Sequence, residues 1–373
     1  MKIAFVVHDY RHMEGHSRYV IELASRFARD HEVHIFTNRV EGVRDGKIVF
    51  HHIPAWRPNA LATALSFFLS ATLRVPDGFD IIHNQGLCGV RGNVFTAHIC
   101  VRAWHHALRR ASGRLAFHEW VSGNVLAGLE YLFYRYARRR HVIAVSKRIE
   151  RDLRTFYHAK MPITIIHHGV DLATFAADPR GSVRSAVRNE IGVDSARFAF
   201  LFVGDMRKGG RQCMQALSRL PCAHLLFVSR TPDLPYRSLA ARLGLAERVH
   251  FLGTTTEVQK YYAAADALLL PTHYDSFAMV VTEAMACGLP VIVSREAGAA
   301  ELIDHGVNGL LLDDFTNIDE LARKMELLQH DRAYAARMGA AARRTAEKYS
   351  WDTIAEQTMQ VYRRVLAQGA PRR

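Results

Sequence analysis

The sequence predicts an α/β protein built from two doubly wound parallel sheets, each covered by helices. Three observations lead to this fold class. Short runs rich in β-branched residues alternate with helical patterns from one end of the chain to the other. A stretch rich in Gly, Pro, Asp and Ser interrupts this alternation once, near the middle. The length of 373 residues exceeds what one compact core accommodates and suits two domains.

Each expected strand is a short apolar run bounded by turn residues, and a helical pattern or a loop separates it from the next. Strands joined in this way form βαβ units, and their sheets are parallel. In the first half of the chain the strands are expected at residues 2–8, 31–37, 47–53, 80–85, 93–99, 141–146 and 163–169. In the second half they are expected at residues 198–204, 224–229, 249–253, 267–272, 290–294 and 309–314.

The interruption lies at residues 169–197 and marks the domain boundary. We expect a first domain over residues 1–172 and a second over residues 173–350, with the C-terminal segment 351–373 packing back onto the first. Two doubly wound domains leave a cleft between the carboxyl ends of their strands, where ligands usually bind. That cleft is therefore the expected position of the site.

The composition narrows the class of protein further. Hydrophobic residues make up 49% and charged residues 23%, which is typical of a globular protein. The five cysteines are scattered without CxxC pairs, which favours reduced thiols in the cytosol over disulfides or a structural zinc site. The longest nearly apolar segment, residues 60–73, is shorter than the roughly 20 residues that span a bilayer. We therefore expect no membrane-integral protein. The N-terminus lacks the apolar region of a signal peptide, so no signal peptide is expected either.

The stretch "YDSFAMVVTEAMACGLPVIVS" at residues 274–294 predicts a helix that begins after a strand. Ser276 is the expected N-cap of this helix. The helix start would then leave unpaired the backbone N–H groups of Phe277, Ala278 and Met279, with the positive end of the helix dipole behind them. Such a helix start is a ready site for a phosphate group.

Two carboxylates flank the same helix. Asp275 lies at its mouth, and Glu283 lies about two turns further along the same face. A ligand with sugar hydroxyls at both ends and phosphates between them would match this arrangement, and a nucleotide sugar is such a molecule. The alternative is that Asp275 only favours the helix N-terminus and that Glu283 is a solvated surface acid. The apolar neighbours favour the first interpretation, because a buried acid needs partners.

Two cations follow the strand expected at residues 198–204. In "FVGDMRKGGRQCMQAL", Arg207 and Lys208 lie between the strand end at Gly204 and a helix start near Gly210. Cations at the carboxyl end of a strand could stabilise the charge that grows on a leaving diphosphate. The alternative is an ordinary solvated loop with basic residues.

The first helix and the fifth strand supply two further candidates. In "HDYRHMEGHSRYVIELASRF", Gly15 is a single glycine at a helix start, which lets a phosphate approach, but the absence of GxGxxG disfavours a dinucleotide cofactor. His98 ends the strand expected at residues 93–99 and should lie at the cleft edge, although a lone histidine is more often structural or exposed. His12 and His16 lack an HExxH signature, so no metal site is expected.

Residues 102–141 form a basic and aromatic helical segment. It contains Arg102, Arg109, Arg110, Arg114, Arg135, Arg138, Arg139 and Arg140, interleaved with aromatic residues that include Trp104 and Trp120. Together with the net charge of +13, this composition favours contact with an anionic membrane surface. The alternative is a solvated face over a buried aromatic stripe. Nucleic-acid binding is disfavoured, because no known nucleic-acid-binding motif accompanies the basic residues.

These residues together resemble the retaining glycosyltransferases of family 4, which have the GT-B fold of two Rossmann-like domains. The resemblance covers nearly the whole chain and is most specific in "DSFAMVVTEAMACGLPVIVSREAGAAELI", which is similar to the family's E-x7-E region. The segments "VIAVSKRIERDL" and "ITIIHHGVDLATF" support it. The short spacing in "GDMRKGG" resembles the lipopolysaccharide core glucosyltransferases.

The resemblance implies a role for each candidate residue. Glu283 would hold the nucleotide ribose, and Asp275, which stands where the family usually has Glu, would contact the hydroxyls of the donor sugar. Arg207 and Lys208 would bind the diphosphate, and His98 would lie beside the reacting sugar. The donor phosphates and sugar would also meet the backbone at Ser276, Phe277, Ala278 and Met279.

Two positions depart from the family's pattern. Gly15 stands alone in "EGH" where the family often has a glycine pair, and it would still approach the donor phosphate. His168 stands where the family's "NGVD" has Asn.

The expected protein is thus a metal-independent retaining glycosyltransferase that needs no cofactor. We expect it to move a sugar from UDP-glucose or a related UDP-hexose to a lipid-linked or phosphorylated glycan of the bacterial cell envelope, such as lipopolysaccharide core. Its expected location is the cytosol, peripheral on the inner membrane. The alternatives are a sugar-nucleotide epimerase of the same fold and a non-catalytic nucleotide-sugar-binding protein. Release of UDP only in the presence of an acceptor would distinguish the transferase from the epimerase.

Overall fold

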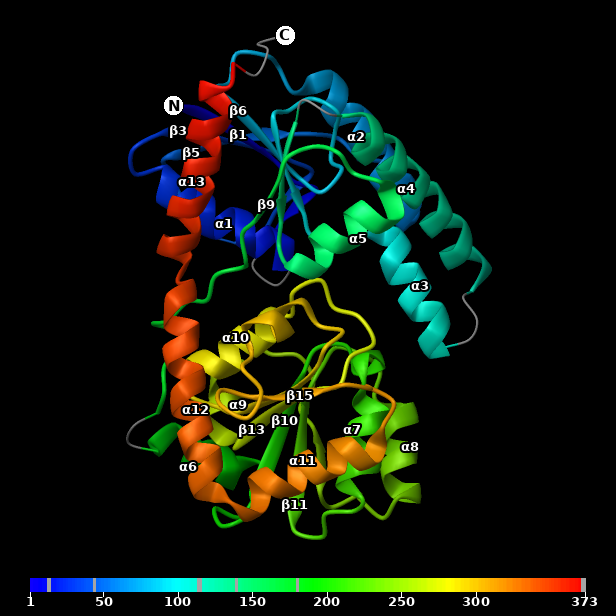
Figure 1. Ribbon diagram of the computed structural model, residues 1–373, viewed down its shortest axis with the longest axis vertical. Coiled ribbons are helices and arrows are strands. Elements are labelled where there is room, and N and C mark those ends of the chain that lie inside the picture. Colours follow the sequence, from blue (N-terminus) through cyan, green and yellow to red (C-terminus); the bar gives the residue numbers. More distant parts are fainter. Residues whose placement is uncertain (12–14, 43–44, 113–115, 138–139, 179–180, 370–373) are drawn as a thin grey trace. The chain divides into compact units, whose positions relative to one another are not determined.

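A computed structural model describes residues 1–11, 15–42, 45–112, 116–137, 140–178 and 181–369 (Figure 1). Its contacts divide the chain into two compact units. Unit 1 contains residues 1–169 together with residues 351–373, and unit 2 contains residues 170–350. Each unit is an α/β domain around one parallel sheet, as the alternation of strands and helices predicts.

Unit 1 has a seven-stranded parallel sheet in the order β5-β3-β1-β6-β7-β8-β9. All seven strands expected in the first half of the chain are confirmed. They are β1 (Lys2–Val6), β3 (Glu32–Thr37), β5 (Ile48–His52), β6 (Ile81–Gln85), β7 (Val94–Ala97), β8 (His141–Ala144) and β9 (Ile163–Ile165). The sequence did not predict the short pair β2 (Asp9–Tyr10) and β4 (Arg39–Val40), because two residues carry no periodic pattern.

Unit 2 has a six-stranded parallel sheet in the order β12-β11-β10-β13-β14-β15. The six expected strands are confirmed as β10 (Phe198–Val203), β11 (Ala223–Val228), β12 (Val249–Phe251), β13 (Ala267–Leu270), β14 (Val291–Ser294) and β15 (Leu310–Leu312). Most residues of these strands are apolar and buried, because helices cover both sides of a doubly wound sheet.

Both sheets have the same switch in strand order. In each unit the chain starts at a central strand, runs to one edge and then returns to the other side of that central strand. The switch lies between β1 and β6 in unit 1 and between β10 and β13 in unit 2. Connections leave the two strands of a switch in opposite directions, and the carboxyl ends there form the usual ligand crevice of such sheets.

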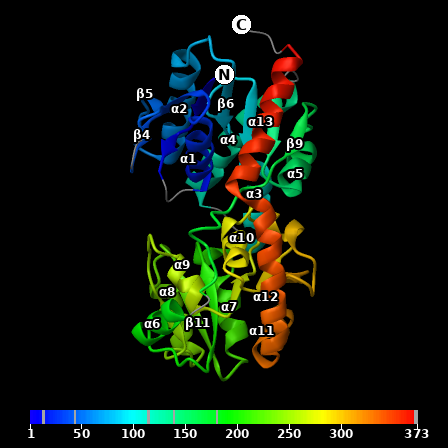
Figure 2. The same ribbon diagram turned by 90° about the vertical axis from the view of Figure 1, so that its left-hand side faces the viewer.

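The helices of unit 1 pack around its sheet. They are α1 (Gly15–Phe27), α2 (Ala60–Arg74), α3 (Val101–Ser112), α4 (Phe117–Tyr136), α5 (Lys147–Tyr157) and α13 (Trp351–Ala367). The C-terminal helix α13 lies along α1 (Figures 1 and 2). Trp351 at its start is buried against Gly169, where an added Cβ would meet the indole at 2.6 Å.

Unit 2 contains α6 (Ser182–Glu190), α7 (Gly210–Leu217), α8 (Leu234–Arg242), α9 (Gln259–Ala264), α10 (Met279–Ala286), α11 (Ile318–His330) and α12 (Arg332–Ala346), and the short helices η1 (Met206–Lys208), η2 (Gly298–Leu302) and η3 (Glu347–Tyr349). Helix α6 lies in the stretch that marked only a domain boundary in the sequence, and it packs against α9. A buried ion pair between Arg188 of α6 and Asp266, at 2.7 Å, holds the helix in place. The polar sequence of α6 does not indicate this pairing.

A buried carboxylate joins three helices of unit 1. Glu130 of α4 accepts hydrogen bonds from the Tyr157 hydroxyl at 2.6 Å and from the Val101 backbone N–H at 2.9 Å, and Tyr157 accepts from the Arg102 N–H at 3.0 Å. Glu130 therefore holds the first amides of α3 to α4 and α5. Burial raises the pKa of Glu130 from its usual 4.5 to about 7, although the Tyr157 and Val101 bonds act in the opposite direction.

Stability should depend on pH through Glu130. Because its pKa is higher in the folded than in the unfolded chain, its proton stabilises the fold fully below about pH 4.5, and this contribution is lost as the pH rises through about 7. We expect the free energy of unfolding to fall by up to about 3 kcal/mol between pH 4.5 and pH 8 relative to Glu130→Gln. Urea unfolding of both proteins across this range measures the difference, and parallel curves would contradict the role of Glu130.

Candidate functional site

A polar pair of unit 2 lies at its switch in strand order. Lys208 follows β10 and Asp275 follows β13, and these two strands are neighbours in the sheet. The Lys208 Nζ lies 2.7 Å from Asp275 Oδ2. The lysine side chain is 37% exposed and the aspartate 16%, so the ion pair borders solvent at the position where doubly wound sheets bind ligands.

A glycine brings the two loops of this pair together. Gly209 follows Lys208 with φ +116°, a conformation that other residues rarely adopt. A Cβ at this position would lie 2.4 Å from the backbone oxygen of Pro271, which follows β13. Only glycine therefore allows the loop after β10 to approach the loop after β13 closely enough for Lys208 to reach Asp275.

The second predicted cation, Arg207, is held by a residue that sequence reasoning missed. Its guanidinium lies 2.6 Å from Asp205 Oδ2, and Asp205 also accepts from the Arg207 backbone N–H and from the Thr231 hydroxyl. Burial alone would raise the pKa of Asp205, but the Arg207 and Thr231 bonds lower it. Arg207 is 70% exposed. The position of Asp205 directly after a strand in "GDMRKGG" was the available signal.

The helix start at the second loop differs from the prediction. Ser276 does not cap the helix: α10 begins at Met279, and Ala278 occupies the N-cap position without a side-chain bond. The Phe277 N–H donates to Asp275 Oδ1 at 3.2 Å, so it is not one of the unpaired amides that the sequence suggested. Asp275 accepts the Phe277 N–H in this turn and pairs with Lys208, and the helix starts two residues later than expected.

Ala278 has a left-handed backbone conformation, with φ +73° and ψ +71°. This conformation costs an L-residue roughly 1–2 kcal/mol. Such strain persists where surrounding contacts fix the chain, and it often marks a functional loop. The amides of Met279 and Val280 follow it at the helix start, where an α-helix offers them no internal acceptor.

Glu283 is buried inside unit 2. It is 6% exposed and accepts a hydrogen bond from the Tyr262 hydroxyl of α9 at 2.9 Å. The alternative of a solvated surface acid is therefore wrong. Tyr262 precedes Glu283 by 21 residues in another helix, so no local sequence signal could have identified it.

His98 lies in unit 1, directly after β7, and is partly buried. Its Nε2 is 2.9 Å from Gln85 Oε1 at the end of β6, and its Nδ1 is 3.4 Å from His168 Nε2. Burial lowers the pKa of His98 well below its usual value, and the neighbouring His168 and His16 lower it further. The imidazole is therefore neutral near pH 7.

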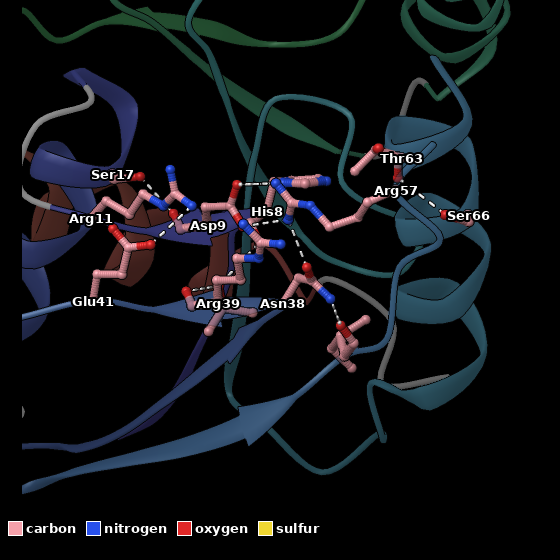
Figure 3. A network of polar contacts seen from close by, with 12 residues as sticks. His8, Asp9, Arg11, Ser17, Asn38, Arg39, Glu41, Arg57, Thr63 and Ser66 are labelled. Carbon is pink, nitrogen blue, oxygen red and sulfur yellow. Dashed lines mark hydrogen bonds and ion pairs between the residues drawn. The ribbon is translucent and has the colours of Figure 1, made fainter. Parts of the chain in front are cut away.

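Gly15 is the first residue of α1, as the sequence predicted, and it is exposed. Nearby, the Ser17 hydroxyl donates to the Asp9 backbone oxygen at 2.5 Å. Figure 3 shows the carboxyl ends of β1 and β3, where Arg57 bridges Asp9 at 3.0 Å and the Asn38 side-chain oxygen at 2.7 Å. This network ties the loop before α2 to the sheet.

The basic and aromatic segment of unit 1 consists of α3 and α4, which pack side by side (Figure 1). They fit closely because a Cβ on Gly123 would overlap the His105 ring. The exposed side chains of the pair include Arg102, Arg109, Arg110, Phe117, Trp120, Leu132 and Tyr136. Trp104 is only partly exposed, and Arg114 lies outside the described residues. Exposed aromatic residues contradict a stripe that is wholly buried.

The predicted residues thus form two groups, each within one unit. Lys208, Arg207, Asp275 and the start of α10 come together in unit 2 at the ends of β10 and β13. His98 and Gly15 belong to unit 1. Among the described residues, no three His, Cys, Asp or Glu side chains come together as a metal site would require.

The fold defines a protein with two doubly wound α/β domains, and sequence comparison identifies its family. The family model described as "Glycosyl transferases group 1" matches residues 183–345, and the model described as "Glycosyltransferase Family 4" matches residues 13–174. The two matches together cover most of both units. The chain therefore belongs to the glycosyltransferases that combine these two domains.

Relatives and solved structures agree with this assignment. The D-inositol 3-phosphate glycosyltransferase of Thermobispora bispora is 27% identical over 94% of this chain and 90% of its own. The crystal structure of WaaG, a glycosyltransferase involved in lipopolysaccharide biosynthesis, superposes with a TM-score of 0.81 at 20% identity, over 96% of this chain and 99% of its own. HepE of Anabaena, solved with UDP-glucose, gives a TM-score of 0.73 at 21% identity, over 97% and 99% of the two chains. These structures share the GT-B fold.

Proposed function

We propose that this glycosyltransferase moves a hexose from a UDP-sugar, with retention of the anomeric configuration, to a lipid-linked or phosphorylated glycan of the bacterial cell envelope. The ion pair between Lys208 and Asp275 carries the proposal. It provides a cation for diphosphate and a carboxylate for sugar hydroxyls at adjacent strand ends, 2.7 Å apart. The complex of HepE with UDP-glucose supports a UDP-sugar as the donor.

In this proposal, the bound donor separates Lys208 from Asp275 and becomes the new partner of both. The diphosphate competes for Lys208 and for exposed Arg207, and Asp275 is then able to accept hydrogen bonds from the sugar. The amides at the start of α10 face the phosphates, and Glu283, held by Tyr262, binds the ribose. Unit 2 is thus the donor domain and unit 1 the acceptor domain.

The proposed reaction needs neither a cofactor nor a metal ion. The bond between the sugar C1 and the diphosphate oxygen breaks, and the acceptor oxygen bonds to C1 on the same face. The acceptor proton passes to the departing phosphate oxygen. Lys208, Arg207 and the helix dipole of α10 stabilise the negative charge that the leaving group gains.

A panel of UDP-, GDP- and ADP-sugars tests the donor, because a ligand that binds only the folded state raises the melting temperature. We expect the largest shift with a UDP-hexose. Release of UDP is then measured with and without a phosphorylated glycan acceptor, and the anomer of the product is assigned by NMR. Release that needs no acceptor would favour an epimerase, and stabilisation without any release would favour a binding protein.

The acceptor is proposed to lie at an anionic membrane surface on the cytosolic side. Among the described residues, no helix has both the length and the apolar character that a bilayer crossing requires. Exposed Phe117 and Trp120 of α4, whose rings stack at 6.2 Å, and exposed Arg109 and Arg110 of α3 would contact lipid. The net charge of +13 and the structural likeness to WaaG support this acceptor class.

Replacing both Phe117 and Trp120 by serine should weaken binding to vesicles that contain anionic lipid by about tenfold or more, because each aromatic ring loses apolar burial. Binding of the unchanged protein should also fall as NaCl is raised, since salt screens the arginines. Vesicle co-sedimentation measures both effects. The matched control is Leu234→Ser, an exposed apolar residue of unit 2, which should bind as the unchanged protein does. Equal binding to neutral vesicles would contradict the proposal.

A further inference from the structure

Gln85 lies at the switch in strand order of unit 1. It is the last residue of β6, next to β1 in the sheet, and it is only 5% exposed. On the β1 side of this switch, Asp9 and Arg57 form an ion pair with each other. On the β6 side, the Gln85 Oε1 binds His98, whereas its Nε2 is buried and has no hydrogen-bond partner among the described residues. Within the described part of the chain, His98 is thus the one hydrogen-bond partner of the Gln85 side chain.

The hydrogen bond to Gln85 determines the proton position on His98. An amide oxygen only accepts, so His98 Nε2 carries the proton and donates to Gln85 Oε1 at 2.9 Å. In the neutral ring, Nδ1 is then an acceptor. Its contact with His168 Nε2 is longer, at 3.4 Å, so this is the side of the ring on which a ligand can replace the protein partner.

A neighbouring histidine shows what a purely structural arrangement looks like. His83, also on β6, is fully buried, and its two ring nitrogens lie 2.7 Å from the Tyr362 hydroxyl and 2.6 Å from the Thr96 hydroxyl. His98 differs in both respects, because it is partly exposed and one of its contacts is long.

We propose that Gln85 is a positioning residue for glycosyl transfer, which fixes His98 as the Nε2-protonated tautomer so that Nδ1 accepts a hydrogen bond from a substrate sugar hydroxyl. This inference rests on the proposed function. The recognised group is a hydroxyl, because an acceptor nitrogen binds an O–H donor and rejects a phosphate or carbonyl oxygen. Gln85 itself does not contact the reacting atoms.

Two variants separate this role from a structural one. Gln85→Met removes the acceptor oxygen at similar size, and Gln85→Glu keeps the oxygen and adds a charge. Neither removes another side-chain hydrogen bond among the described residues, because Nε2 makes none. Gln360→Glu on α13, which is exposed in the same unit, is the matched control for the charge.

The tautomer of His98 is read from ¹⁵N NMR of the ligand-free protein, with His98→Asn to assign the signal. Nε2-protonated His98 in the unchanged protein and a shifted tautomer in Gln85→Met are expected. The inference would be overturned if the tautomer were the same in both. This readout needs no substrate, so it is independent of the proposed function.

Steady-state kinetics supply the second readout. We expect Gln85→Met to lower kcat/KM by about tenfold, the value of one hydrogen bond. In Gln85→Glu the carboxylate should raise the pKa of His98, so activity should fall as the pH drops towards 6, whereas Gln360→Glu and the unchanged protein should not show this fall. Unchanged kinetics in both Gln85 variants would overturn the inference and leave the proposed function intact. Failure of the unchanged protein to bind any nucleotide sugar would overturn both.

Discussion

Replacing Lys208 by alanine should lower kcat by about 100-fold or more while the protein stays folded. Lys208 ends η1, in the connection after β10, with its ammonium group 2.7 Å from Asp275, at the switch in strand order of unit 2. In the proposed reaction this cation stabilises the charge that develops on the leaving diphosphate, and loss of one such preorganised group typically costs 10² to 10³ in turnover. Initial rates at saturating UDP-sugar measure the effect.

The matched control is Lys324→Ala. Lys324 also pairs with a carboxylate at 2.7 Å, that of Glu320, but on helix α11 and one turn apart on the same helix. This variant should retain near-normal turnover, because its pair is not at the strand ends. Near-normal turnover in Lys208→Ala would contradict the charge-stabilising role. Melting temperatures of both variants distinguish lost chemistry from lost folding, since Lys208→Ala leaves Asp275 without its ammonium partner.

Replacing Arg188 by alanine should destabilise unit 2 by about 3–5 kcal/mol, the usual cost of breaking a buried ion pair. Arg188 is 1% exposed. Its guanidinium donates to Asp266 at 2.7 Å and to four backbone oxygens, those of Ala264, Asp194, Ser195 and Arg197. Alanine would leave these acceptors buried without their donor. Equilibrium unfolding in urea measures the loss.

Arg237→Ala is the control for Arg188. Arg237 pairs with Asp233 at the same 2.7 Å, but its side chain is 55% exposed. A solvated ion pair contributes little, so the free energy of unfolding should change by no more than about 1 kcal/mol. Equal losses in the two arginine variants would show that burial does not determine the effect and would contradict the account of α6 packing.

The strands could be predicted from the sequence because each is a short apolar run that a parallel sheet buries on both faces. All thirteen expected strands of the two large sheets are present, for example the run at Phe198–Val203. Helix α6 was not recognised, because its stability comes from Arg188 and Asp266, which are 78 residues apart. A pairing at that separation leaves no local periodic signal.

For the candidate site, the sequence predicted the positions of the residues but not their contacts. Lys208 and Asp275 could be placed near strand ends, because each lies in the loop that follows an apolar run. Their mutual ion pair could not, since it depends on the order of β10 and β13 and on the space that Gly209 leaves beside Pro271. The start of α10 was misplaced by two residues, because Asp275 uses its carboxylate in a turn before the helix.

The sequence by itself determined two parallel α/β domains, the family and the residue types at the strand ends, because these depend on local periodicity and on short motifs. The tertiary structure alone decided which of those residues meet: Lys208 with Asp275, Glu283 with Tyr262, and His98 with Gln85. The physical reason is that strand order in a sheet is set by packing between distant segments. The contacts between Lys208 and Asp275 and between His98 and Gln85, at 2.7 and 2.9 Å, exist only after that order is fixed, and the Glu283–Tyr262 bond exists only after α9 packs beside α10.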